Sequence, residues 1–571
     1  MAHGVTYFAE TDFRGQRTRF GIKDEDRTRH VYVIGKTGMG KSTLLENMAA
    51  QDIQNGNGVA FIDPHGSAVD KLLDYVPEHR IKDVIYFAPF DLDYPISFNV
   101  LEDVGKDQRQ LVVNGLMSAF KKIWGEESWS DRMAYILTNI LLALLEYPGA
   151  TLLGVNRMIA DKEYRNKVVA NVTDPSVKSY WLDEFANYTE RFAAEATPAI
   201  QNKIGQFTSN PLIRNIIGQE RSSVDFRKIM DERKILLINL SKGRLGEGNA
   251  NLLGSLLITK IYLAAMSRAN LPPAQLALAP EFFFFVDEFQ SFANESFADI
   301  LSEARKYHLS LTIAHQYVEQ MSEEVRAAVF GNVGTTISFR VGPLDAEIFE
   351  KIYNPTFTKE DMVNLGRFQM YLSLMIDGVG STPFSARNLP PISPPPVSYR
   401  DRIIESSRSL YAVPRVTVEE KIGKWHSETR QNNLTKSGPR NTPPPRPASS
   451  APPMTKAAPV IPRSPLPPRP TPPREESDGF VPLKELTKVA QPPKLDPPER
   501  SVSLAALKPK IGGEKSTGKH AADLKDVLLA VQKEAPVKKV EAPTRPPSAP
   551  PPVAPIKAEV PEADLRKLLE L

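Results

Sequence analysis

The sequence has 571 residues, a formal net charge of +3 and no cysteine. Single hydrophobic cores stop growing well below this length, so we expect more than one structural unit. The lack of cysteine excludes disulfides, thiolate metal sites and cysteine nucleophiles, and it permits a reducing compartment. Residues 401–571 carry a charge of +9, which leaves −6 for residues 1–400. The main body therefore has no bulk attraction for nucleic acid, and any such contact there needs a local patch or a ring of subunits.

The sequence shows no clear targeting or membrane-spanning segment. Residues 1–9 lack the basic start and apolar stretch of a secretion signal. The longest apolar runs, 133–145 and 252–266, are shorter than the roughly 20 residues that a spanning helix needs. We therefore expect a soluble, cytoplasmic protein.

Residues 30–390 alternate short apolar runs of β type with longer helical patterns. This alternation predicts a mainly parallel sheet covered by helices. Strands are expected at residues 30–34, 59–63, 84–87, 235–240, 282–287, 309–314, 335–340 and 368–375. Between residues 103 and 232 the β-type runs vanish and helical periodicity replaces them, which predicts an all-α insertion.

The composition changes from about residue 395. Residues 441–475 contain 14 prolines, and proline can join neither strand ladders nor helix interiors, so we expect a disordered tail from residue 396 onward. Four short apolar islands interrupt the tail, and the last opens with a candidate N-cap, Asp564. The islands are residues 481–486, 502–507, 522–531 and 563–571. They are equally consistent with incidental hydrophobic residues in a linker and with short helices that dock partners.

The strongest motif follows the first expected strand, with the spacing G-x-x-x-x-G-K-[ST] and a helical pattern after it. Glycines let backbone N–H groups wrap phosphates, the lysine reaches the β and γ oxygens, and the hydroxyl binds Mg²⁺. A strand before the motif and a helix after it are the context that a true phosphate-binding loop requires, and they argue against a chance match. We assign ATP binding to Gly35, Lys36, Thr37, Gly38, Met39, Gly40, Lys41, Ser42 and Thr43.

A second site is expected at the end of the strand 282–287, where five apolar residues precede Asp287 and Glu288. A continuous apolar run is typical of a central parallel strand, and ligands bind at the carboxyl edge of such sheets. We expect Asp287 to hold Mg²⁺ together with Ser42, and Glu288 to polarise the attacking water. The alternative is an acidic helix start after a core strand.

Two further residues are candidates for catalysis. Gln316 follows the strand expected at 309–314, where a polar amide can sense the γ-phosphate. Arg305 precedes that strand and is a candidate to neutralise transition-state charge across a subunit boundary. A cation that merely favours a helix C-terminus explains Arg305 equally well.

Taken together, these residues resemble the HerA/FtsK superfamily of hexameric motor ATPases, and within it the type IV coupling proteins of the TraD/TraG kind. Residues 35–43 look like Walker A, and Asp287-Glu288 looks like Walker B. The turn Asp63-Pro64-His65-Gly66 is similar to a family turn that follows the second strand. Residues 303–307 and 314–316 resemble the stretch that carries a trans-acting arginine and a sensor glutamine, and residues 330–340 resemble the next strand, which makes Arg340 a second arginine-finger candidate.

The resemblance covers roughly residues 5–390 and implies an α/β, RecA-like P-loop fold. The expected domains are an ATPase domain formed by residues 1–102 and 233–395, the all-α insertion 103–232, and the basic tail 396–571. The insertion resembles the lid domain of coupling proteins. Only about 29 residues precede the first expected strand, where coupling proteins usually have membrane helices, so membrane recruitment would need a partner.

The resemblance implies an ATP-driven DNA translocase acting as a homo-hexamer, with secretion-machinery or relaxase-type partners on the insertion and the tail. Two alternatives stay open: a secretion or pilus ATPase that moves protein, and a recruiting scaffold in which hydrolysis is only a timer. The segment 241–244 is a weak candidate for a pore loop, and a plain surface turn explains it better.

Overall fold

The structure is a computed structural model that describes residues 4–12, 16–102, 105–188 and 190–436. An 11-stranded sheet forms its centre, in the order β2-β1-β13-β10-β9-β3-β8-β7-β4-β6-β5. The strands are β1 (Val5–Thr11), β2 (Arg19–Lys23), β3 (Val31–Ile34), β4 (Gly58–Asp63), β5 (Val84–Phe87), β6 (Ile235–Asn239), β7 (Phe282–Val286), β8 (Leu309–His315), β9 (Thr335–Ser338), β10 (Gln369–Ser373) and β13 (Phe384–Asn388). Each of the eight strands expected from the sequence is present.

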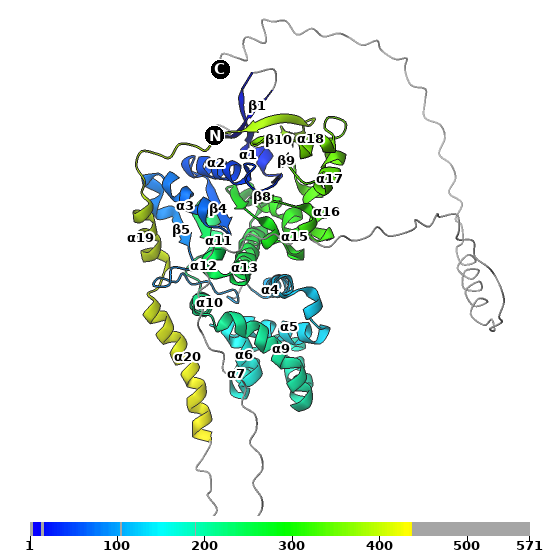
Figure 1. The fold of residues 1–571 in the computed structure, drawn as a ribbon. Helices are drawn as coiled ribbons and strands as arrows, with labels where there is room; N and C mark the ends of the chain where they lie inside the picture. The colour runs from blue at the N-terminus through cyan, green and yellow to red at the C-terminus, as the bar shows by residue number, and fades with distance from the viewer. Residues whose placement is uncertain (1–3, 13–15, 103–104, 189, 437–571) are drawn as a thin grey trace, which may run out of the picture. The chain divides into compact units, whose positions relative to one another are not determined.

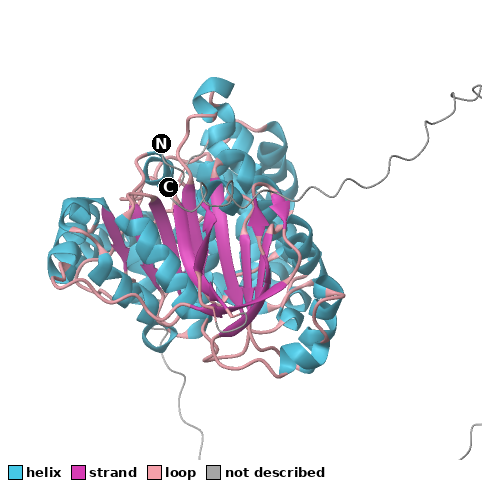
Figure 2. Cartoon of the chain, turned by 90° about the horizontal axis from the view of Figure 1, so that it is seen from above, coloured by secondary structure: helices cyan, strands magenta, loops and turns pink. Residues whose placement is uncertain are grey.

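The seven strands from β9 to β5 in this order are parallel to their neighbours, which confirms the predicted mainly parallel sheet. Helices cover both faces of the sheet (Figure 2). The strand β7 shows why both faces need a cover, because all five of its residues are buried. Phe283 and Phe285 pack into one core, whereas Phe282, Phe284 and Val286 pack into the other. A strand that is apolar on both faces requires helices on both faces.

Different helices bury the two faces. The core on one side contains residues of α2 (Lys41–Gln54) and α3 (Ser67–Leu72). The core on the other side contains residues of α13 (Glu247–Met266) and of helices that follow β7 and β8. The remaining helices of this part are α1 (Asp24–Arg27), α12 (Lys242–Leu245), α14 (Pro273–Leu276), α15 (Glu295–Glu303), α16 (Glu323–Asn332), α17 (Pro343–Tyr353) and α18 (Lys359–Val363).

Four antiparallel strands extend one end of the sheet, and three of them were not expected from the sequence. The strand β1 pairs with β2 and with β13, and β10 pairs with β13 and with β9. The prediction that the first strand begins at residue 30 is therefore wrong, because β1 begins at Val5. β1 is stabilised by β13, which is more than 370 residues away in sequence, so local pattern alone does not reveal it. A small hairpin of β11 (Met375–Ile376) and β12 (Val379–Gly380) lies apart from this sheet.

The all-α insertion is confirmed as a stretch without strands, since the described residues between β5 and β6 form none. Its helices α5, α6, α7 and α9 gather apart from the sheet (Figure 1). Its α-helices are α4 (Arg109–Trp124), α5 (Asp131–Leu145), α6 (Leu153–Ala160), α7 (Lys162–Asn171), α8 (Pro175–Ser179), α9 (Glu190–Thr208), α10 (Pro211–Ile217) and α11 (Phe226–Asp231). The insertion contacts the ATPase domain where α4 packs against α13. The two helices are very close at Gly115, because a Cβ there would lie 2.5 Å from Thr259 Cγ2.

Among the described residues, one helical stretch, 247–270, is long and apolar enough to cross a membrane by length and composition. It contains α13, and 67% of its most apolar window is buried within the protein. Its apolar character is accounted for by its position as the central helix on one face of the sheet.

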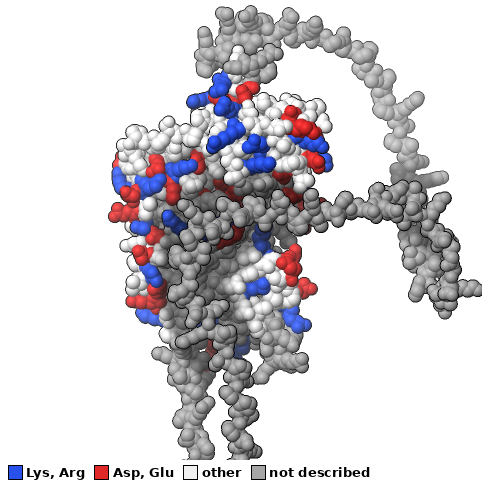
Figure 3. All heavy atoms as spheres, viewed as in Figure 1, with Lys and Arg blue, Asp and Glu red and all other residues white. Residues whose placement is uncertain are grey.

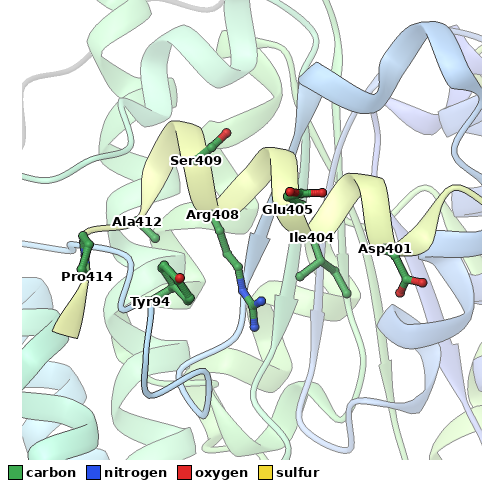
Figure 4. A pocket seen from close by; sticks show the side chains of 8 residues that line it. All are labelled: Tyr94, Asp401, Ile404, Glu405, Arg408, Ser409, Ala412 and Pro414. Atoms are coloured by element: carbon green, nitrogen blue, oxygen red, sulfur yellow. The ribbon is translucent and has the colours of Figure 1, made fainter.

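The structure corrects the predicted start of the tail. Residues expected to be disordered form α19 (Arg400–Tyr411) and α20 (Arg415–Lys436). α19 packs on β5, with Ile403 fully buried and Ser407 Oγ accepting a hydrogen bond from the Tyr86 N–H at 2.9 Å. α19 lines a pocket of about 760 Å³ with Glu405 and Arg408. Tyr94 of the facing loop lines it as well (Figure 4). Prolines cluster at residues 390–396, before these two helices, so proline content does not mark where the folded part of the chain ends.

α20 continues from α19 onto the all-α insertion. Val418 and Ile422 form a small apolar cluster with Leu153 of α6. Trp425 packs edge-on against Tyr164, and the Arg157 guanidinium lies 4.7 Å from the Trp425 ring. The two helices therefore tie the edge of the sheet to the insertion. Residues 437–571, which contain the four apolar islands, lie outside the described residues.

The charge distribution agrees with the mildly acidic composition of the main body. On the face shown in Figure 3, basic and acidic side chains are mostly interspersed.

Candidate nucleotide-binding site

The loop between β3 and α2 has the conformation that the glycine spacing predicts. Gly38 and Gly40 have φ values of 76° and 126°, a region that residues with a Cβ rarely adopt. Lys41 begins α2 and is buried, and its Nζ donates to the Gly35 carbonyl oxygen at 2.7 Å. Burial lowers the pKa of Lys41, while the charges of Glu288 and Asp287 oppose this shift. The loop thus holds one ammonium group against backbone carbonyls at the start of a helix, where anions bind.

Ser42 and Asp287 come together across 245 residues of sequence. Ser42 Oγ donates to Asp287 Oδ2 at 2.9 Å, and Asp287 directly follows β7. Asp287 is 4% exposed, and burial raises its pKa to about 6, while the hydrogen bond from Ser42 lowers it. The predicted hydroxyl and carboxylate ligands of a magnesium ion are therefore adjacent.

This pair fits magnesium better than a metal held by protein alone. Mg²⁺ keeps several waters and is bound through one or two carboxylates plus substrate phosphates. Within the described residues there is no group of three or more His, Cys, Asp or Glu that could hold a metal. One carboxylate and one hydroxyl beside a phosphate-binding loop are the donor set expected for Mg²⁺ bound with a nucleotide.

Glu288 is connected to the loop by a chain of side chains. Thr37 Oγ donates to Gln316 Oε1 at 3.0 Å, and Gln316 Nε2 donates to Glu288 Oε1 at 2.7 Å. Gln290 Nε2 donates to the second oxygen, Oε2. Glu288 also has φ 47° and ψ 47°, a left-handed conformation that is uncommon outside glycine and recurs at functional sites. The structure therefore aims this carboxylate toward the loop and fixes both of its oxygens.

A family model described as the type IV secretion-system coupling protein DNA-binding domain matches residues 19–352. The chain belongs to this family. The resemblance to coupling proteins found in the sequence is thereby confirmed.

No curated protein matches the chain. Among solved structures, it is similar to the bacterial conjugative coupling protein TrwBdeltaN70 in its unbound form, with 14% identity and a TM-score of 0.49, over 65% of this chain and 87% of that one. The same protein in complex with ADP and Mg²⁺ gives 15% identity and a TM-score of 0.48, over the same shares of both chains. VirB4 of Thermoanaerobacter pseudethanolicus gives 14% identity and a TM-score of 0.45, over 70% of this chain and 99% of that one.

In this coupling-family chain, the turn Asp63-Pro64-His65-Gly66 has a structural explanation. The Asp63 carboxylate accepts hydrogen bonds from the N–H groups of His65 and Ala68, both at 2.7 Å, and so caps the start of α3. Gly66 has φ 87°, and a Cβ there would lie 2.4 Å from Asn239 Oδ1. The motif therefore stabilises the loop edge of the sheet beside Asp287.

The sequence did not reveal the role of His315, which lies under the loop. His315 is fully buried, its Nε2 is 2.6 Å from the Tyr32 hydroxyl, and its carbonyl oxygen accepts from the Gly35 N–H at 3.3 Å. Burial, with a smaller contribution from Lys41, lowers its pKa to about 3. A neutral histidine thus joins β3 to β8 directly below the phosphate loop of this coupling-family chain. The available signal was a histidine at the end of a buried strand, next to Gln316.

The two arginine candidates occupy different places. Arg305 is exposed on the short 3₁₀ helix Ala304–Tyr307. Arg340 is half-buried after β9, and its carbonyl oxygen accepts from the Lys36 N–H of the same chain at 2.8 Å. In the described part of the chain, neither arginine side chain makes a hydrogen bond or ion pair with Glu288 or Gln316. Within the described residues of one subunit, Lys41 is therefore in contact with the phosphate loop, whereas the side chains of Arg305 and Arg340 make no such contact with Glu288 or Gln316.

The segment 241–244 was expected to be a plain surface turn, but Ser241 is the N-cap of the short helix α12 and residues 242–244 lie in that helix. In α12, Lys242 Nζ donates to Ser291 Oγ at 2.9 Å. The Arg244 guanidinium lies 4.4 Å from the Phe90 ring. Both basic side chains thus contact their own chain.

Proposed function

We propose that this member of the coupling-protein family is an ATPase that translocates DNA as a ring-shaped oligomer in conjugation or type IV secretion. The observation that carries the proposal is the convergence of two pairs at the carboxyl edge of one sheet: Ser42 with Asp287, and Gln316 with Glu288. The first pair suits a metal-bound triphosphate and the second suits an attacking water. The family match supplies the link to DNA.

Each side chain has a defined task in this mechanism. Backbone N–H groups of residues 35–43 and the Lys41 ammonium hold the phosphates. Ser42 and Asp287 would hold Mg²⁺, which would supply positive charge to neutralise the phosphates. Glu288 orients and polarises the attacking water, and Gln316 holds Glu288 in place through its amide. The similar coupling protein TrwB has been solved in complex with ADP and Mg²⁺, and the ligands assigned here are ATP and Mg²⁺.

The assembly belongs to the same proposal. Because neither Arg305 nor Arg340 reaches Glu288 within one chain, an arginine of a neighbouring subunit completes the site, as in other shared-site motors. The residues 1–102 and 233–395 form the ATPase domain, and the insertion 103–232 and the tail meet relaxase-type or secretion partners. The protein acts in the cytoplasm at the inner face of the membrane, to which a partner recruits it.

The test measures ATP turnover of the full chain without DNA, with single-stranded DNA and with double-stranded DNA. Turnover stimulated by DNA and weakened by salt is expected, because phosphate contacts release counterions. Glu288→Gln is the matched control. It should abolish ATP turnover but keep ATP binding, because Lys41 and the loop that hold the phosphates are unchanged. An ATP turnover rate that neither single-stranded nor double-stranded DNA changes would instead favour an ATPase that moves protein. An unchanged biological role of Glu288→Gln would favour a recruiting scaffold.

A further inference from the structure

The order of the strands determines the direction in which a bound nucleotide extends. Glu288 follows β7 and Gln316 follows β8, so both lie on one side of β3 and of its phosphate loop. The γ-phosphate must face Glu288, which acts on the water that attacks it. The base at the other end of the nucleotide then extends toward the opposite side, which is formed by β9, β10 and β13.

On that side, the turn before β10 touches the phosphate loop. β10 is antiparallel to β9, with Tyr371 opposite Ser338, so β10 begins at the edge where β9 ends. The Phe368 N–H donates to the Met39 carbonyl oxygen at 3.1 Å. A Cβ on Gly40 would lie 3.1 Å from Phe368 Cδ1, so the aromatic ring lies against the loop itself. The ring is half-buried and keeps one part open to solvent.

Phe368 is held in an unfavourable conformation by its neighbours. Its φ of 66° is rare for a bulky residue. The Asn388 N–H donates to the Phe368 carbonyl oxygen at 2.8 Å, and Asn388 Nδ2 donates to the Gly40 carbonyl oxygen at 3.0 Å. The end of β13 therefore holds the Phe368 backbone and the phosphate loop together. Strained backbone of this kind persists where the surroundings determine it, and it recurs at ligand sites.

The guanidinium of Arg367 lies over the Phe368 ring. The Arg367 side chain is exposed, and its guanidinium carbon is 4.7 Å from the centre of the Phe368 ring. Planar guanidinium groups and aromatic rings are the side chains on which nucleic-acid bases stack.

We propose that Arg367 and Phe368 form the platform on which the base of the bound nucleoside triphosphate stacks. This assignment rests on the proposed nucleotide site and deepens it. Stacking uses the π-face that every base has, so it does not by itself distinguish one base from another. The site therefore selects a triphosphate with an aromatic base and discriminates weakly between ATP and GTP.

The test compares dissociation constants for ATP, GTP and tripolyphosphate, measured with Mg²⁺ by calorimetry on the full chain. Arg367→Ala is the main variant, because an exposed side chain can be removed without disturbing the core. Phe368→Leu is the second variant and keeps the bulk behind Gly40. Each is expected to weaken ATP and GTP about tenfold and to leave tripolyphosphate within about twofold, since alanine substitution of a stacking partner costs about that much per base.

Two controls separate this inference from the proposed function. Arg402→Ala removes another exposed arginine, 60% exposed and distant in sequence, and should change none of the three constants. Lys41→Ala should lose all three ligands, because they share the phosphates. Equal weakening of tripolyphosphate and ATP by Arg367→Ala, or no change in either, would overturn the platform while the nucleotide site stands. A wild-type chain that binds neither ATP nor tripolyphosphate would refute the proposed function, and the platform with it.

Discussion

Glu288 shows how much of the site depends on single side chains. Its left-handed backbone and the two amides on its oxygens, from Gln316 and Gln290, hold the carboxylate for one task. Lys41 has a different task, because it contacts the loop that wraps the phosphates. The two residues therefore affect different steps.

At the residue scale, Lys41→Ala should abolish ATP binding, whereas Glu288→Gln should bind ATP normally and lose at least about a hundredfold in turnover, the usual contribution of a positioned base. Nucleotide binding and steady-state hydrolysis are measured on both variants. Turnover near the wild-type rate in Glu288→Gln would remove this residue from its assigned role.

Gln316 should act through Glu288. Gln316→Ala removes the 2.7 Å hydrogen bond to Glu288 and the contact with Thr37. We expect kcat to fall about tenfold with little change in KM for ATP, because the phosphate contacts remain. Thr37→Val, which breaks only the first link of the chain, is the milder control. A rise in KM with unchanged kcat would show that Gln316 binds the nucleotide rather than positioning Glu288.

At the scale of elements, the tail begins later than its proline content suggests. A chain ending after Lys436 should keep the basal ATPase of the full protein, since it retains α19 and α20. A chain ending after Pro390, close to the domain boundary at residue 395 that the sequence predicts, loses both helices and uncovers β5, so it should be much less stable or fail to fold. Ile403→Ala offers a graded control, because emptying this buried position should cost about 2–5 kcal/mol. Thermal unfolding and ATP turnover are compared for the three. An intact, fully active chain 1–390 would show that α19 is not part of the domain.

Lys260 supplies a prediction for the central helix α13. It is half-buried among apolar residues, and burial lowers its pKa from 10.5 to about 8. The folded state therefore bears the cost of its charge below about pH 8, and this cost disappears as the pH rises toward 10.5, where the unfolded chain also loses the proton. Lys260→Met should raise stability at pH 7 by up to about 3 kcal/mol and by much less at pH 10. Unfolding in denaturant at both pH values measures the difference. A gain in stability that is the same at both pH values would show that the methionine stabilises the protein through packing and not through loss of the buried charge.

At the scale of the whole molecule, the question is whether neighbouring subunits share a site. Arg305→Ala subunits keep Glu288, and Glu288→Gln subunits keep Arg305. In a mixed ring, about a quarter of the interfaces then join an intact Glu288 to an intact Arg305. If Arg305 acts in trans, mixing two inactive variants should restore ATP turnover, and wild-type turnover should rise steeply with protein concentration.

Arg340 is the second candidate for this role, although its backbone contacts the loop of its own subunit. The same mixing experiment with Arg340→Ala decides between the two arginines. Recovery with Arg340→Ala alone would transfer the role to Arg340. Mixtures that assemble but stay inactive in both cases would refute the shared site.

The sequence by itself determined the parallel strands, the phosphate loop and the acidic strand end. Each of these depends on a local pattern: a run such as Phe282–Val286 is apolar on both faces wherever it lies, and the glycines at 38 and 40 permit φ values that other residues avoid. Asp287 and Glu288 could be predicted for the same reason, because they come directly after the apolar run and so mark the end of the strand.

The tertiary structure alone decided what touches these residues. β1 depends on β13, α19 depends on β5, and Phe368 reaches Gly40 only because an antiparallel strand returns to the loop. Such contacts join segments hundreds of residues apart, and no local periodicity encodes them. His315 shows the same limit at the residue scale, since its neutral state follows from burial beneath the loop rather than from its neighbours in sequence.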